Sequence, residues 1–300
     1  MELFFQQLIN GLAVGGIYAL VALGYTMVYG VLKLINFAHG DLFTVGAYLG
    51  LTFLVSAGVM NTFGPVGGLS VLAVLIAGLV GLVGVLVERA AYRPLRNSNR
   101  LSAVVSALGA SIFLQNAVML VYGARFRVYP RNLFPDTISL LGLQLSFMRV
   151  FLLLISFSLM LALYWFIHKT RTGAAIRATA IDQDAARLMG INVNRILTLV
   201  FFIGPALGGC AGLLVGLYYG QINFTMGWMY GMKAFTAAIL GGIGNIPGAM
   251  LGGVLLGVIE ALGAAYISIA WKDAIAFAVL ISILIFRPHG LLGERVADKL

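Results

Sequence analysis

The chain has 300 residues, of which 61% are apolar and only 10% are charged, and its mean hydropathy is +1.01. Soluble globular proteins average about 45–50% apolar and about 25% charged residues, so this composition excludes an ordinary soluble protein and predicts one multi-pass membrane domain over residues 1–300. The net charge of +9 does not indicate nucleic acid, because the basic residues follow a membrane-topology pattern instead.

The predicted elements are helices long enough to cross a bilayer, which requires about 20 mostly apolar residues. The fold class is therefore all-α, a polytopic bundle of eight or nine crossings with broken or re-entrant segments. The segment at 231–247 is interrupted by glycines and the segment at 273–286 is short, so either one could be a half-span or a re-entrant piece instead of a full span. The candidate segments are 8–32, 42–60, 66–87, 101–122, 150–167, 196–217, 231–247, 248–267 and 273–286.

The placement of lysine and arginine predicts the orientation of the bundle. Thirteen of the nineteen basic residues lie in the stretches 88–100 and 168–195, at the C-terminus and at Lys33. If these face the cytosol, the N-terminus is outside and the C-terminus inside. Four of the other six basic residues lie in or beside the loop at 123–149, namely Arg125, Arg127, Arg131 and Arg149. They weaken the difference in basic charge between the two sides without reversing it.

Two stretches indicate broken helices, INFAHGD at 35–41 and LGGIGNIPG at 240–248. Transporters often build substrate sites where helices unwind, but a plain tight turn at the membrane surface is the favoured interpretation of each stretch. Asn36, His39 and Asp41 form the polar part of the first stretch. They either line a gate, or they cap the next helix with Asp41 while His39 sits at headgroup level.

Glu260 stands in the middle of an apolar span, where a charge costs about 2.5–3.5 kcal/mol by insertion scales. Its carboxyl group is therefore expected to face the bundle, either in the transport path or in a structural hydrogen bond to a neighbouring helix. Lys272 and Asp273, beside Trp271, are interpreted as an interfacial anchor.

Small residues recur at four-residue spacing along one apolar helix, at Gly204, Gly208, Gly212 and Gly216. In lipid, such spacing lets helix backbones approach closely. The pattern predicts tight helix packing, either inside the bundle or at a subunit interface.

The polar stretch DQDAARLMG at 182–190 lies between two apolar spans. Asp182 is a suitable N-cap, Asp184 would complement the helix dipole in the first turn, and Gly190 suits a left-handed helix end. A second short helix is predicted at 172–180, just upstream. Together with Ala185, Ala186 and Arg187, the segment at about 169–195 is either a surface for a partner protein or a solvated loop.

The motif D-A-A-x-x-x-G at 184–190 resembles the signature of ABC importer permeases, a cytoplasmic helix that docks onto an ATPase subunit. It has Asp where Glu is usual and lacks the downstream I-x-L-P. The stretches 15–50, 172–196, 237–262 and 286–293 resemble the branch of permeases for hydrophobic, branched-chain amino acids, closest to its H-type members. The resemblance implies coupling through Asp182, Asp184, Ala185, Ala186, Arg187 and Gly190.

The sequence contains no G-x-x-x-x-G-K-[ST] motif, so the chain cannot cradle ATP phosphates in the usual way. The resemblance implies two separate ATPase subunits that bind ATP and Mg, a second permease of the M type, a soluble substrate-binding protein and a bacterial inner membrane. The chain itself is expected to hold no cofactor or metal and to be no enzyme. The alternatives are a secondary transporter driven by an ion gradient and a related ABC permease for urea or short amides.

Overall fold

The computed structural model describes residues 2–56, 59–96, 98–130, 138–140 and 143–293. Arg131, Arg295 and Lys299, which the orientation argument counted, lie outside these residues. Each predicted apolar segment corresponds to a long helix. These helices are α1 (Glu2–Leu32), α2 (His39–Ser56), α3 (Val59–Val87), α4 (Arg100–Tyr122), α5 (Phe147–Lys169), α8 (Val193–Tyr219), α9 (Met226–Gly241), α10 (Ile246–Tyr266) and α11 (Lys272–Phe286).

The shorter elements lie at the two ends of the bundle. The α3 helix continues into a π-helical turn η1 (Glu88–Tyr92) and a 3-10 turn η2 (Arg93–Leu95), and η3 (Ile269–Trp271) precedes α11. Two short helices, α6 (Arg171–Ile181) and α7 (Gln183–Leu188), join α5 to α8. The strands β1 (Arg127–Val128) and β4 (Gln221–Ile222) form one antiparallel pair, and β2 (Ile138–Leu140) and β3 (Leu143–Leu145) form another.

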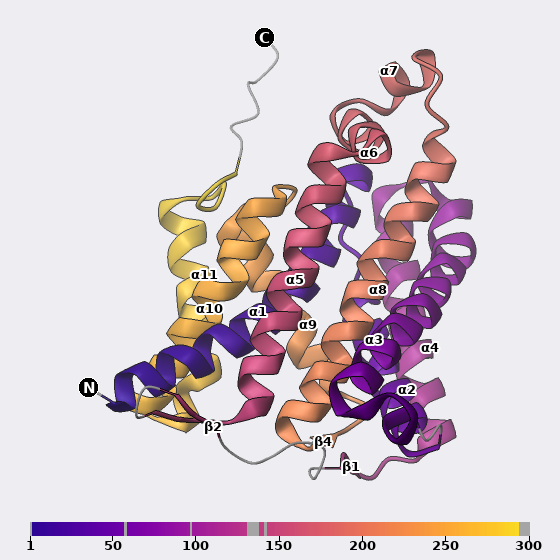
Figure 1. The fold of residues 1–300 in the computed structure, drawn as a ribbon. Helices are drawn as coiled ribbons and strands as arrows, with labels where there is room; N and C mark the ends of the chain where they lie inside the picture. The colour runs from indigo at the N-terminus through magenta and orange to yellow at the C-terminus, as the bar shows by residue number, and fades with distance from the viewer. Residues whose placement is uncertain (1, 57–58, 97, 131–137, 141–142, 294–300) are drawn as a thin grey trace.

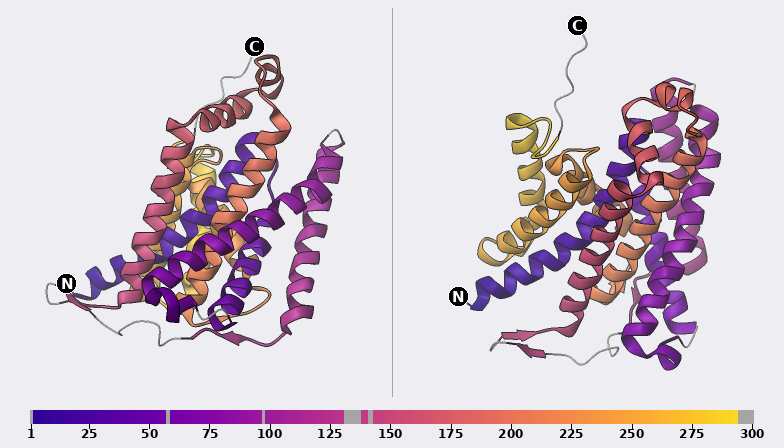
Figure 2. Two further views of the ribbon diagram at one scale, coloured as in Figure 1. Left: turned by 45° about the vertical axis from the view of Figure 1, so that its right-hand side comes forward. Right: turned by 45° about the horizontal axis from the view of Figure 1, so that its top comes forward.

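The long helices run alternately between the two ends of the bundle (Figure 1). The α6 and α7 helices lie at one end, as do the α9–α10 turn and the last turn of α11, whereas α1 begins at the other end, where the short strands lie (Figure 2). Seven helices in the described part of the chain are long and apolar enough to cross a membrane, and α2 and α9 are not among them. The number of crossings therefore stays a prediction.

Glycine contacts bring the helices of the core close together, because without a side chain two backbones can touch. The α1 and α10 helices cross at Gly15 and Gly257, where a methyl group on either glycine would overlap the other helix's backbone. On α8, Gly204 faces Gly24 of α1 and Gly212 faces the Phe43 carbonyl of α2. Gly208 and Gly216 also face inward, toward His39 and Tyr129. The four-residue stripe therefore packs within this chain's own bundle.

The predicted break at 240–248 is a tight turn between α9 and α10. The predicted segment 231–247 was too long at its C-terminal end, since α9 ends at Gly241 and both Gly242 and Gly244 have positive φ. Asn245 caps α10 by accepting the N–H of Gly248 at 2.9 Å. The chain after α11 closes over the same turn, because the N–H groups of Leu291 and Leu292 bond to the last carbonyls of α9.

We predict that Gly257→Ala destabilises the protein while Gly109→Ala does not. The added methyl group would overlap Gly15 in the first variant, and overpacking typically costs about 1–3 kcal/mol. Gly109 lies on α4 with no neighbour within 4 Å, and alanine favours a helix over glycine by about 1 kcal/mol. Thermal unfolding in detergent measures both, and equal midpoints would contradict the close crossing of α1 and α10.

Candidate functional site

The α6 and α7 helices are held at fixed angles by their caps. Thr170 begins α6 by accepting the N–H of Gly173 at 3.0 Å, and Gly173 lies so close to the carbonyls at the end of α5 that a side chain there would overlap them. Arg177 of α6 donates to the Ile167 carbonyl, one of those same groups. The predicted helix at 172–180 is thus confirmed, and it lies against the last turn of α5.

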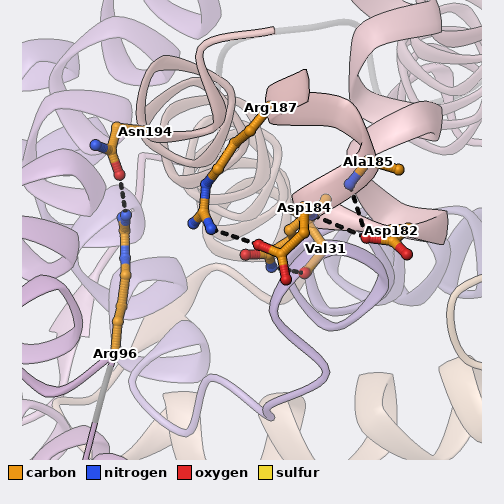
Figure 3. A network of polar contacts seen from close by, with 8 residues as sticks. Val31, Arg96, Asp182, Asp184, Ala185, Arg187 and Asn194 are labelled. Atoms are coloured by element: carbon orange, nitrogen blue, oxygen red, sulfur yellow. Dashed lines mark hydrogen bonds and ion pairs between the residues drawn. The ribbon is translucent and has the colours of Figure 1, made fainter. Parts of the chain in front are cut away.

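The cap of α7 is the one that the sequence predicted. The carboxylate of Asp182 accepts the N–H groups of Asp184 at 2.8 Å and Ala185 at 3.0 Å, and Gly190 has the left-handed φ of +83° (Figure 3). Asp184 also pairs with Arg187 at 2.7 Å, on the surface. Such a short helix is marginal alone in water, so the caps and its packing on the bundle define its position.

The exposed side of this segment is more apolar than the sequence argument recognised. Ile181, Leu188 and Met189 are 86%, 89% and 82% exposed, and Ala185 lies three and four residues before the last two, so these share a helix face. We call these four residues the docking face. By contrast, Ala186 is only 3% exposed and packs beneath the helix, so it is not available to a partner. The missed signal was the presence of large apolar residues within an otherwise polar stretch.

One polar link connects α7 to α1, and a second link nearby joins the end of α3 to the start of α8. The Gln183 side chain donates from Nε2 to the Val31 carbonyl in the last turn of α1, at 2.8 Å. Arg96, just beyond η2, donates from Nη1 to Asn194 at the start of α8, at 2.7 Å (Figure 3). Arg96 also pairs with the buried carboxylate of Glu88. Burial lowers the pKa of Arg96, and the adjacent Glu88 opposes that shift. A cavity of about 350 Å³ lies among these links.

The polar residues of the first broken helix are buried within the bundle. Asn36 accepts hydrogen bonds from the Ala38 N–H and the Tyr92 hydroxyl, and Asp41 accepts one from Ser111 of α4. His39 is fully buried, with its ring centroid 4.7 Å from that of Tyr25. The expectation that His39 sits at headgroup level is therefore wrong, because Gly24 and Gly208 leave room for its ring inside the bundle.

Glu260 lies at the centre of a buried charge cluster. Its Oε1 is 3.0 Å from Nζ of Lys233 and 2.8 Å from Nζ of Lys272, and its Oε2 accepts the Tyr18 hydroxyl at 2.8 Å. Lys233 also pairs with Asp273 at 2.6 Å. The two lysines and two carboxylates balance in charge. Lys272 and Asp273, at the start of α11, contribute to this cluster, and their interpretation as an interfacial anchor stays a prediction.

Neither polar cluster resembles a metal centre. Among the residues that the structure describes, no group of three or more histidine, cysteine, aspartate or glutamate side chains converges as metal ligands would. The Asn36, His39 and Asp41 side chains do not form one site either, since the hydrogen bonds of Asn36 and Asp41 go to different helices.

The long apolar helices and the capped end helices α6 and α7 are the features of a polytopic α-helical membrane protein. Residues 7–284 match the family described as the permease component of the branched-chain amino acid transport system. The chain belongs to this family, and it is the permease component of an ABC transport system rather than an enzyme.

Named relatives support this membership over nearly the whole chain. The high-affinity branched-chain amino acid transport system permease protein BraD of Pseudomonas aeruginosa is 46% identical, covering 99% of this chain and 98% of the relative. The high-affinity branched-chain amino acid transport system permease protein LivH of Escherichia coli is 45% identical, covering 99% of this chain and 97% of the relative. A probable branched-chain amino acid transport permease protein LivH of Methanocaldococcus jannaschii is 28% identical, covering 91% of this chain and 88% of the relative.

We predict that Asp182→Ala loosens α7, since removing an N-cap side chain costs about 1 kcal/mol. Amide hydrogen exchange over residues 183–188 should become faster, while exchange in α8 stays unchanged. Asp182→Asn is the matched control, because its side-chain oxygen can still accept both N–H groups. Equal exchange in all three proteins would show that the cap contributes nothing.

We predict that Glu260→Gln lowers the unfolding midpoint in detergent far more than Asp184→Asn does. The first change leaves Lys233 and Lys272 with only the Asp273 carboxylate, and breaking a buried ion pair costs about 3–5 kcal/mol. The second removes an exposed pair of the kind worth at most about 1 kcal/mol. A midpoint for Glu260→Gln near that of the unmodified protein would contradict the charge cluster.

Proposed function

We propose that the α6–α7 end of the bundle faces the cytosol of a bacterial cell and that α1 begins outside. The support is the basic charge at that end, in the α3–α4 connection, along α6 and α7 and at Lys33, because cytoplasmic loops carry an excess of lysine and arginine. We also propose that residues 1–300 form a single domain, since α1 packs against α8, α9 and α10 from the far part of the chain.

The observation that carries the proposed mechanism is the docking face. Large apolar side chains on a rigidly capped helix in water would be unfavourable unless a partner covers them. We infer that the partner is an ATPase subunit, two of which bind ATP and Mg for the assembly. The family membership favours this energy source over the alternative of an ion gradient.

Force on the docking face would reach α1 through Gln183, and it would reach α8 along the chain that joins α7 to α8. Gln183 connects α7 to the end of α1, and Arg96 connects the end of α3, through Glu88 and Asn194, to the start of α8. Moving a two-state gate from 1:99 to 99:1 takes about 5.5 kcal/mol of differential binding. Closure of the ATPases would supply that energy, and tilting α6–α7 would alternate access between the two sides.

The proposed cargo is a branched-chain or other hydrophobic amino acid delivered by a soluble binding protein. The printed names of the BraD and LivH relatives support this class, while urea and short amides are the alternative within the wider family. We propose that a second, M-type permease completes the path. The buried polar residues then stabilise this permease and do not contact the cargo. Asn36, Asp41 and Glu260 bond to other side chains of the same chain. His39 is enclosed by helices of the same chain.

We predict that Leu188→Asp abolishes both co-purification of the ATPase subunits and ATP-dependent leucine uptake, because it places a charge at the centre of the docking face. Ala185→Arg, one helical turn away, should act in the same direction. Leu188→Met is the matched control, since it keeps an apolar side chain of similar size, and it should retain both readouts.

The unfolding midpoint of each purified variant separates docking from folding. Leu188 and Ala185 are exposed, so their variants should unfold at the midpoint of the unmodified chain, whereas Ala186→Glu should lower it. ATPase assembly and uptake that survive Leu188→Asp would overturn the proposed coupling.

A further inference from the structure

An open groove lies between the end of α3 and the start of α8. Its volume is about 570 Å³. The lining residues fall into two sets, one polar and one apolar. They are Arg89, Arg93, Asn192, Asn194, Arg195 and Thr198, and Val85, Leu199 and Phe202.

The groove exists because α3 and α8 diverge from a close crossing. A methyl group on Gly84 of α3 would overlap the Phe201 carbonyl and Pro205 of α8, so the two backbones touch at that level. One turn further toward the α6–α7 end, Val85 and Arg89 face Leu199 and Arg195 across open space.

The charge of the groove is not neutralised by the part of this chain that the structure describes. Within those residues, Arg89, Arg93 and Arg195 have no ion pair. Glu88 is the nearest carboxylate in sequence, but it is buried and paired with Arg96. Three arginines therefore line one opening, and the guanidinium group of arginine can bind two oxygens of a phosphate at once.

The apolar part of the groove lies on its membrane side. Val85, Leu199 and Phe202 are further from the polar end of each helix than Arg89, Arg93 and Arg195 are. Leu82 and Leu86, on the same part of α3, are 57% and 62% exposed, so the surface below the arginines is suited to hydrocarbon. This order, cationic above and apolar below, matches an amphiphile that stands upright in a bilayer.

We propose that this groove binds an anionic phospholipid. The phosphodiester lies among Arg89, Arg93 and Arg195, with the side-chain amides of Asn192 and Asn194 within the same opening. One acyl chain runs along Val85, Leu199 and Phe202 toward the bilayer centre. A soluble phosphate would use only the upper part of this groove, and an acidic protein segment would leave its apolar part uncovered.

The bound lipid would join the two helices that Arg96 already links. Arg93 and Arg195 lie on opposite sides of the groove, and Asn194, which accepts from Arg96, lines it as well. A phosphate shared between η2 and α8 would hold the end of α3 against the start of α8. The lipid composition of the bilayer would then influence how motion of α7 reaches the bundle.

The test measures lipid retention by the full-length chain, purified in mild detergent with its co-purifying partners. Phosphatidylglycerol or phosphatidylcholine is added, and native mass spectrometry counts the lipids bound. The unmodified protein should retain phosphatidylglycerol in preference to phosphatidylcholine. Arg89→Gln/Arg195→Gln should weaken that retention about tenfold or more, since each basic residue near a membrane surface contributes about 1 kcal/mol.

Lys33→Gln/Arg287→Gln is the matched control. It removes two exposed positive charges from the same end of the bundle without touching the groove, so phosphatidylglycerol retention should be unchanged. Equal losses in both double variants would show general attraction to anionic lipid and overturn the site.

Competition with glycerol 3-phosphate at millimolar concentration identifies the source of the phosphate. Lipid retention that resists this soluble headgroup supports the phospholipid, while full displacement would assign the groove to a soluble phosphate and overturn the proposal. Unchanged retention in Arg89→Gln/Arg195→Gln, together with loss of ATPase co-purification, would overturn it too, because the arginines would then belong to a protein interface.

Discussion

Close contact between glycine-rich helix surfaces is the constraint on which the rest of this structure depends. In lipid the chain gains little from hiding apolar side chains, so helices associate through tight packing and through polar groups that need partners. The crossing of α1 with α10 at Gly15 and Gly257 joins the two halves of the sequence, and the glycines of α8 do the same for α1 and α2. Those contacts place the ends of α1, α3 and α8 beside one another, beneath α7.

Apolar length and helix caps could be predicted from the sequence because both are local. Every apolar segment became a helix, and Asp182 and Gly190 begin and end α7 as their residue types indicate. The partners of Glu260 could not be predicted, because Lys233 and Lys272 lie on other helices and only the packing brings them together. For the same reason the sequence interpretation of Lys272 rested on its neighbour Trp271 alone and did not include its ion pair with Glu260.

The docking face shows a subtler limit of sequence reasoning. A six-residue helix is too short for a hydrophobic period to reveal which side faces the bundle, so Ala185 and Ala186 looked equivalent. In the structure one is exposed and the other buried, and the exposed side is dominated by Leu188 and Met189. The polar links through Gln183 and Arg96 were likewise invisible, since Gln183 is 152 residues from Val31 and Arg96 is 98 residues from Asn194.

The buried charge cluster also bears on how the chain enters the membrane during synthesis. Lys233 leaves the ribosome first, and Glu260 follows only 27 residues later, with Asp273 later still. An unpaired lysine at the centre of a helix opposes insertion by about 2.5–3.5 kcal/mol, so α9 cannot settle in lipid by itself. The carboxylates that pair with Lys233 lie on α10 and α11, so stable insertion of α9 is expected to depend on those two later helices.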